Sequence, residues 1–289
     1  MKTKNLLKYF MIAAVVSIIF AACKKRETTP TPVDSDTSGA ADNALAEGTF
    51  NDISNIADQG AAGSLSSYLS ASNNYSGERG TLTACAIITL DSTVSGGITT
   101  HTIKIDFGAI PHACLDGKIR TGIINASYKG YYHALESRLV IGFDQYSVNG
   151  NLVVGSNTII HKNPVNGHKS DSIYVNATIT KFNSGGATIH WVSSRAREWI
   201  AGDNTPSDKT DDIFSISGNI TGTHSNGNGF SATCDNLKIH LNCKWIESGD
   251  LNYTPSGKST RYIKFGTDGT CDSLATVQLE GVTTTFIMP

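Results

Sequence analysis

The chain has 289 residues, of which 23 are Lys or Arg and 25 are Asp or Glu, so its formal net charge at pH 7 is −2. This balance, without a basic stripe, excludes nucleic acid as an expected partner. Charged residues make up 17% of the sequence, which is low against a typical share of about 25%. Serine, threonine, asparagine and glycine take their place, and this composition favours short strands and tight turns over helices.

The N-terminal segment has the pattern of an export signal. Several lysines precede the uncharged run 11–22, which is shorter than the roughly 20 apolar residues that span a bilayer. The run ends in small residues directly before Cys23, and this arrangement resembles the lipobox of bacterial lipoproteins. We therefore predict that residues 1–22 are a lipoprotein signal peptide and that the acylated Cys23 attaches the protein to a lipid bilayer. The alternative is an ordinary cleaved signal peptide that happens to precede a cysteine.

The next two segments differ in pattern. Residues 23–41 are polar, contain Pro30 and Pro32, and show no apolar period, so we predict a lipidated cysteine followed by a flexible tether. Residues 42–60 fit a short helix, in which Asp42 can cap the N-terminus and Gly60 can end the last turn. Its apolar residues fall on one face at helical spacing: Ala46, Phe50, Ile53 and Ala57.

The remaining residues, 61–289, carry a period of two. Runs such as 102–107, 173–179 and 187–192 alternate apolar and polar side chains, and Asn-Gly or Gly-Gly pairs separate them. Such pairs between alternating runs are strong signals for hairpins, and their spacing leaves no room for the helices of a parallel sheet. We predict an all-β fold, an antiparallel hairpin meander that forms a large twisted sheet or a sandwich, with one short N-terminal helix.

The chain has 6 cysteines, and when the expected lipid site is set aside the remaining odd number cannot all pair. An exported protein enters an oxidising compartment, which favours disulfides. A Ser-Gly turn lies near the midpoint between Cys85 and Cys114, and another lies between Cys243 and Cys271. A hairpin folded at each turn brings its ends together, so we predict the disulfides Cys85–Cys114 and Cys243–Cys271, with Cys234 free. Pairing of Cys234 with Cys243 is the alternative.

One predicted strand carries an unusual set of side chains on a single face: Trp191, Ser193, Arg195, Arg197 and Trp199. Two guanidinium groups flanked by indole rings could bind a ligand by stacking on sugar rings or by holding carboxylates. The alternative is a structural ladder of Arg and Trp side chains that stabilises the meander through cross-strand pairs.

The loop after this strand is rich in acidic residues, namely Asp203, Asp208, Asp211 and Asp212. Oxygen ligands of this kind can bind Ca²⁺, but the order does not fit an EF-hand, and most such loops are solvated. The histidines are scattered, and the sequence contains no HExxH, GxSxG or P-loop motif. We therefore predict no metal, no cofactor and no catalytic residue.

Four segments together resemble a family of Bacteroidota outer-membrane lipoproteins that has no established activity. They are Asp106 to Gly122, Phe143–Asn151, Trp191–Gly202 and Cys243–Asp272. The resemblance covers nearly all of the mature chain and implies a β-rich domain anchored to the outer membrane. Surface-exposed lipoproteins of this phylum often carry acidic residues after the lipidated cysteine. Here Lys24-Lys25-Arg26 follow, which slightly favours the periplasmic face over the cell surface.

These patterns favour a membrane-anchored lipoprotein that acts as a non-enzymatic binding or structural module of the cell envelope. The tether and the hairpin-rich domain point to this function, and its partner would be a glycan or an envelope protein. The alternative is a glycan-binding or glycan-hydrolysing protein that uses the face with Trp191, Arg195, Arg197 and Trp199.

Overall fold

The computed structural model describes residues 38–61, 85–114, 116–205, 210–266 and 270–288. Within these ranges a single antiparallel sheet of 14 strands accompanies helix α2 (Ser38–Ala61) and the short 3-10 helix η1 (Phe182–Ser184). The strands are β1 (Ile87–Ser95), β2 (Ile98–Asp106), β3 (His112–Ala113), β4 (Ile119–Lys129), β5 (Arg138–Val148), β6 (Asn151–Val165), β7 (His168–Lys181), β8 (Ala187–Ala201), β9 (Ile213–Thr223), β10 (Gly229–His240), β11 (Ser248–Pro255), β12 (Arg261–Phe265), β13 (Leu274–Leu279) and β14 (Val282–Ile287).

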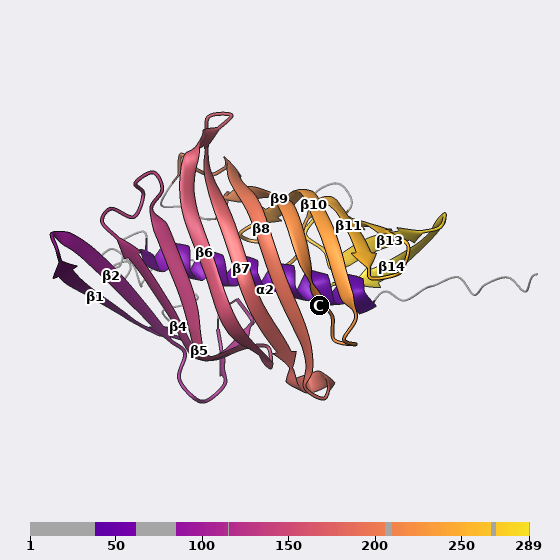
Figure 1. The fold of residues 1–289 in the computed structure, drawn as a ribbon, viewed down its shortest axis with the longest axis horizontal. Helices are drawn as coiled ribbons and strands as arrows, with labels where there is room; N and C mark the ends of the chain where they lie inside the picture. The colour runs from indigo at the N-terminus through magenta and orange to yellow at the C-terminus, as the bar shows by residue number, and fades with distance from the viewer. Residues whose placement is uncertain (1–37, 62–84, 115, 206–209, 267–269, 289) are drawn as a thin grey trace, which may run out of the picture. The chain divides into compact units, whose positions relative to one another are not determined.

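The predicted all-β meander is confirmed, and its form is one sheet. The strands lie side by side in chain order from β1 to β14, apart from β3, which pairs with β4 beside the main path (Figure 1). The tight turns explain this order. Asn149-Gly150 and Asn166-Gly167 have positive φ at both residues, the conformation of the two-residue turns that join twisted antiparallel strands. Each strand therefore folds back onto its predecessor.

Helix α2 lies along one face of the sheet and crosses the strands (Figure 1). Its predicted apolar face is confirmed, because Ala46, Phe50, Ile53 and Ala57 are fully buried. The helix begins at Ser38 rather than at Asp42, so the predicted tether ends earlier and Asp42 is not the N-cap. The Asp42 carboxylate instead binds Lys181 of β7 and Ser225 in the turn after β9.

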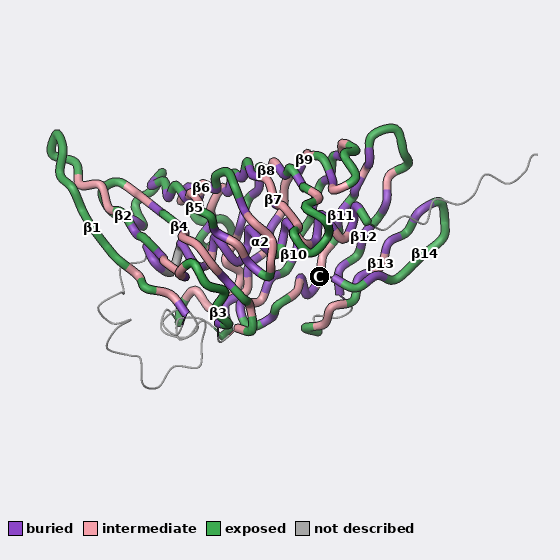
Figure 2. Tube along the Cα trace, turned by 90° about the horizontal axis from the view of Figure 1, so that it is seen from below, coloured by how far each residue is buried: buried purple, intermediate pink, exposed green. Residues whose placement is uncertain are grey.

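The two faces of the sheet differ in burial, as the alternating colours along the strands show in Figure 2. Apolar residues of the face next to α2 join the helix in one hydrophobic core. The opposite face, which we call the outer face, is mostly exposed or half-buried. The alternation follows from the pleat, since successive side chains of a strand point to opposite faces.

Both predicted disulfides are confirmed. Cys85 is bonded to Cys114 and Cys243 to Cys271, and each pair closes around a hairpin. Cys234 is free and buried on β10, so the alternative pairing with Cys243 does not form. The prediction succeeded because a chain that reverses near its midpoint returns its two ends to the same place.

The features predicted for the N-terminus lie largely outside the described residues. They are the signal peptide 1–22, Cys23 and the tether as far as residue 37. In the part of the chain that the structure describes, no helix has the length and apolar character needed to span a membrane.

Candidate functional site

Part of the face predicted for ligand binding lies beneath the helix. Trp191 is fully buried on β8, where its ring stacks on Phe50 of α2 with 5.2 Å between ring centroids. The Trp191 indole N–H donates to Asn43 Oδ1 at 3.2 Å. Arg195 lies on the same face with its guanidinium 4.8 Å from the Trp191 ring. These side chains are therefore not a surface on which a sugar could stack, because the chain's own helix occupies it.

Arg195 forms a buried ion pair with Glu47 of α2. The guanidinium Nη1 donates to Glu47 Oε1, and both side chains are 0% exposed. Burial raises the pKa of Glu47, and this effect exceeds the opposing attraction of Arg195. Asn51, one helical turn further on, donates a weaker hydrogen bond of 3.4 Å to the same carboxylate oxygen. The pair fixes the middle of the helix to β8.

A second ion-pair cluster holds the C-terminal half of the helix. Asp52 accepts hydrogen bonds from Arg120 Nη2 at 2.9 Å and from Lys118 Nζ at 2.6 Å. Arg120 also donates to Asp116 Oδ1 at 2.9 Å. Burial alone would raise the pKa of Asp52, but Lys118 and Arg120 together hold it below its usual value. This carboxylate therefore stays ionised beside two cations.

A third cluster surrounds Asp42 near the start of the helix. Lys181 Nζ donates to Asp42 Oδ1 at 2.5 Å, and the backbone N–H of Ser225 donates to Oδ2 at 2.9 Å. Burial opposes ionisation here too, yet Lys181 and Ser225 lower the pKa of Asp42. The buried ring of His224 lies beside this carboxylate and hydrogen-bonds Tyr253 on β11. The start of the helix is thereby attached to β7, β11 and the turn after β9.

Arg197 and Trp199 of the predicted face contact other residues. Arg197 Nε donates to Asp171 Oδ2 at 2.9 Å, and His161 Nδ1 lies 2.7 Å from Asp171 Oδ1. Burial raises the pKa of Asp171, but Arg197 and His161 outweigh it and lower the value. Trp199 is half-buried, with its ring 5.5 Å from Phe214. Asp171 and Phe214 lie directly opposite Arg197 and Trp199 on the neighbouring strands. Both contacts are therefore cross-strand pairs, as the structural alternative expects, whereas Trp191 and Arg195 contact the helix.

The acidic loop does not come together as a cation site among the described residues. Asp203 Oδ2 lies 4.0 Å from His168 Nδ1, Asp211 accepts a hydrogen bond from Thr205, and Asp212 is buried. Asp208 lies outside the described residues. Across the described ranges, close grouping of metal-ligand types is found at Cys243, Glu247 and Cys271. The two sulfurs there form a disulfide, so neither is available as a thiolate ligand.

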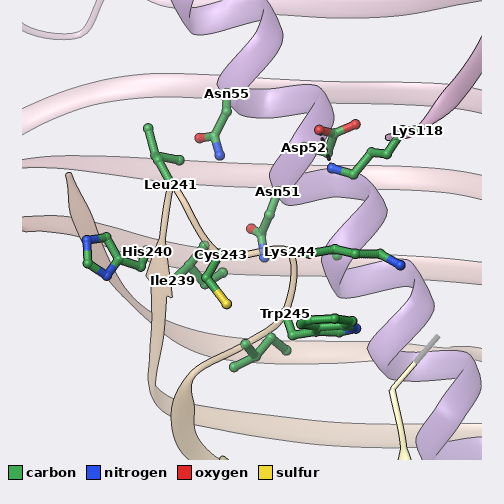
Figure 3. Close-up of a pocket in the computed structure, with 12 residues that line it drawn as sticks. Asn51, Asp52, Asn55, Lys118, Ile239, His240, Leu241, Cys243, Lys244 and Trp245 are labelled. Atoms are coloured by element: carbon green, nitrogen blue, oxygen red, sulfur yellow. Dashed lines mark hydrogen bonds and ion pairs between the residues drawn. The ribbon is translucent and has the colours of Figure 1, made fainter. Parts of the chain in front are cut away.

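A small cavity lies between α2 and the segment 239–246 (Figure 3). Its polar lining includes Asn51, Asn55, Lys118 and His240, and its volume is about 40 Å³. A water molecule needs roughly 10–15 Å³ on this measure. The cavity can therefore hold a few waters but not a sugar ring or a cofactor.

The outer face carries an extended arrangement of uncharged, mainly polar side chains. Two neighbouring rows run through the pairing register of β4 to β11, and their side chains are exposed or half-buried and uncharged. We call this set the outer strip: Asn125, Gly142, Ser156, Asn176, Val192, Thr221, Ser231 and Thr254 in one row, and Ser127, Val140, Thr158, Tyr174, Ser194, Asn219, Thr233 and Asn252 in the other.

Sequence reasoning did not identify the acidic residues of the helix or the outer strip. The signal for the first was present, since Asp42, Glu47 and Asp52 occur within a segment that otherwise has a clear apolar face. The strip depends on strand register and could not be found from one strand at a time.

No family model, curated protein or solved structure matches this chain.

Proposed function

We propose that this protein is a lipid-anchored, non-enzymatic binding or structural module of the outer membrane. The lipobox-like residues before Cys23 and the resemblance to Bacteroidota outer-membrane lipoproteins support the anchor. Lys24-Lys25-Arg26 directly after this cysteine favour the periplasmic face.

The two faces of the sheet differ in what they contact, and this difference supports a binding role. The inner face holds α2 through ion pairs near its start, middle and C-terminal half. The outer face presents hydroxyl and amide side chains to solvent on β4 and on every strand from β6 to β11. Such groups both donate and accept hydrogen bonds, so this face is suited to contact with a polar partner in the envelope.

Metabolic labelling with a fatty-acid analogue tests the anchor. We expect the wild-type protein to be labelled and to fractionate with the outer membrane, whereas Cys23→Ala should be neither labelled nor retained there. Cys234→Ala is the matched control and should be labelled like the wild type, because Cys234 lies within the folded sheet. Equal labelling of the Cys23→Ala variant and the wild type would end the proposal.

A further inference from the structure

We propose that the outer strip binds a neutral, hydroxyl-rich polysaccharide laid across the strands. The inference rests on the proposed function as a binding module and names the class of its ligand. It places the ligand on the outer face. The opposite, inner face carries Trp191, Arg195 and Arg197, and α2 lies against it.

The strip is a regular array rather than a random polar surface. Ser156 lies directly opposite Asn176, Thr221 is opposite Ser231, and Ser194 is opposite Asn219. Adjacent strands are about 4.7–4.9 Å apart, so the side chains of one row repeat at that interval. A ligand with its own repeat of hydrogen-bonding groups can contact such an array many times, and a linear polysaccharide has that form.

The absence of charge along the strip selects a neutral ligand. The two rows contain no Asp, Glu, Lys or Arg from β4 to β11, and the first charged members are Asp91 and Lys104 on β1 and β2. An anionic or cationic polymer would find no opposite charges along these rows. Ser, Asn, Gly and Tyr are also enriched in antibody binding loops, where they supply hydrogen bonds and rigid aromatic contact area.

Tyr174 supplies an aromatic surface in the middle of the strip. It is 44% exposed on β7, with Thr158 and Ser194 directly opposite it on the neighbouring strands. A tyrosine ring combines a large apolar face with a hydroxyl that hydrogen-bonds. The C–H face of a sugar ring can pack on this ring while its hydroxyl groups bond to the neighbours.

The β1 end of the strip is hollowed. A depression of about 410 Å³ lies over β1, β2, β4 and β5, with Thr102, Asn125 and Ser127 in its lining and the charged Asp91 and Lys104 on its β1 and β2 side. Gly142 is also part of the lining, and a Cβ at this position would meet no atom within 4 Å. Ligand pockets usually have roughly 300–1,000 Å³, so the depression can receive one or a few sugar units at the end of a polymer chain.

The test measures the affinity of the purified, detergent-solubilised full chain for neutral polysaccharides, namely a glucan, a mannan and a xylan. Polygalacturonate serves as the anionic comparison. Tyr174→Ala removes the aromatic contact, and Thr221→Lys places a long charged side chain on the array. The matched controls make the same changes at exposed positions outside the strip: Tyr131→Ala in the loop after β4 and Thr284→Lys on β14, which pairs with the buried Val277 and so lies on the opposite face.

We expect at least one neutral polysaccharide to bind, polygalacturonate to bind at least about tenfold more weakly, and both strip variants to lose about tenfold in affinity. The controls should bind like the wild type, and the melting temperature of all four variants should be unchanged. Binding that the strip variants leave intact would overturn the inference, as would no binding of any neutral polysaccharide. Self-association abolished by Thr221→Lys, without glycan binding, would assign the strip to contact with a second copy instead. Fatty-acid labelling of the same preparation separates these failures from failure of the proposed anchor.

Discussion

Three acidic side chains of α2 each have a basic partner on the sheet. The pairs are Asp42 with Lys181, Glu47 with Arg195, and Asp52 with Arg120. Buried ion pairs contribute little net stability because desolvation offsets their attraction, but breaking one is costly. A shift of the helix by one turn, about 5.4 Å, would separate all of these pairs. The pairs therefore disfavour a shift of the helix along the sheet.

Glu47→Ala tests this role at the most deeply buried pair. The substitution leaves the Arg195 charge buried without its carboxylate, so we expect a loss of about 3–5 kcal/mol in the free energy of unfolding, measured by urea denaturation. The double variant Glu47→Leu with Arg195→Met removes both charges and should recover most of that loss, because matched apolar pairs are often neutral or stabilising. A loss below about 1 kcal/mol in the single variant would show that the pair is not a buried charge contact.

At the scale of elements, the main contact of the fold is that of one helix with many strands. Helix α2 contacts β2, β4, β5, β6 and β8, and its first turn also approaches Tyr253 on β11. The approach is close because Gly39 has no side chain, and a Cβ there would overlap the Tyr253 hydroxyl and the His224 ring. The helical turn before Asp42 can therefore approach the sheet this closely only with a glycine at this position.

Gly39→Ala should weaken the attachment of the helix. Tyr253 and His224 are buried and have little room to move, and overpacking of this kind typically costs about 1–3 kcal/mol. Gly48→Ala is the matched control within the same helix, since a Cβ at Gly48 meets no atom within 4 Å. It should stabilise the protein by about 0.5–1 kcal/mol through helix propensity. Thermal unfolding followed by circular dichroism measures both, and a melting temperature raised by both variants would contradict the close contact at Gly39.

For the molecule as a whole, the two disulfides lie toward the two ends of the sheet. Cys85–Cys114 closes the hairpin of β1 and β2, and Cys243–Cys271 closes that of β11 and β12. The end strands β1 and β14 are largely exposed (Figure 2) and pair with a neighbour on one side. Closing loops of this length should contribute roughly 3–4 kcal/mol each in the chain-entropy account.

Peptide mapping without reduction checks this arrangement. We expect Cys85 linked to Cys114, Cys243 linked to Cys271, and a thiol at Cys234. That thiol should resist alkylation in the folded protein and react fully in denaturant, because burial, assisted by Glu47, raises the pKa of Cys234 to about 12. Ser231, exposed on the same strand, offers a control position, since Ser231→Cys should alkylate without denaturant. A crosslink between Cys114 and Cys243 would refute the hairpin assignment.

Local pattern in the sequence was enough to determine the strands, the turns, the helix face and both disulfides. Each depends on residues close together in the chain: alternation within a strand, Asn-Gly pairs such as Asn149-Gly150, and cysteines that flank one reversal. The same alternation correctly placed Trp191, Arg195 and Arg197 on one face. It could not say whether that face meets solvent or the protein interior, because period two is identical in both cases.

Only the tertiary structure decided what covers each face. Glu47 and Arg195 are 148 residues apart in the chain, and no local pattern links a helical acid to a strand that distant. The outer strip likewise exists only after every strand has taken its register against the next, since a slip of one residue would exchange the two faces. The physical reason is the same for both: long-range pairing depends on the combined packing of all strands against α2, whereas alternation and turn chemistry act within a few residues.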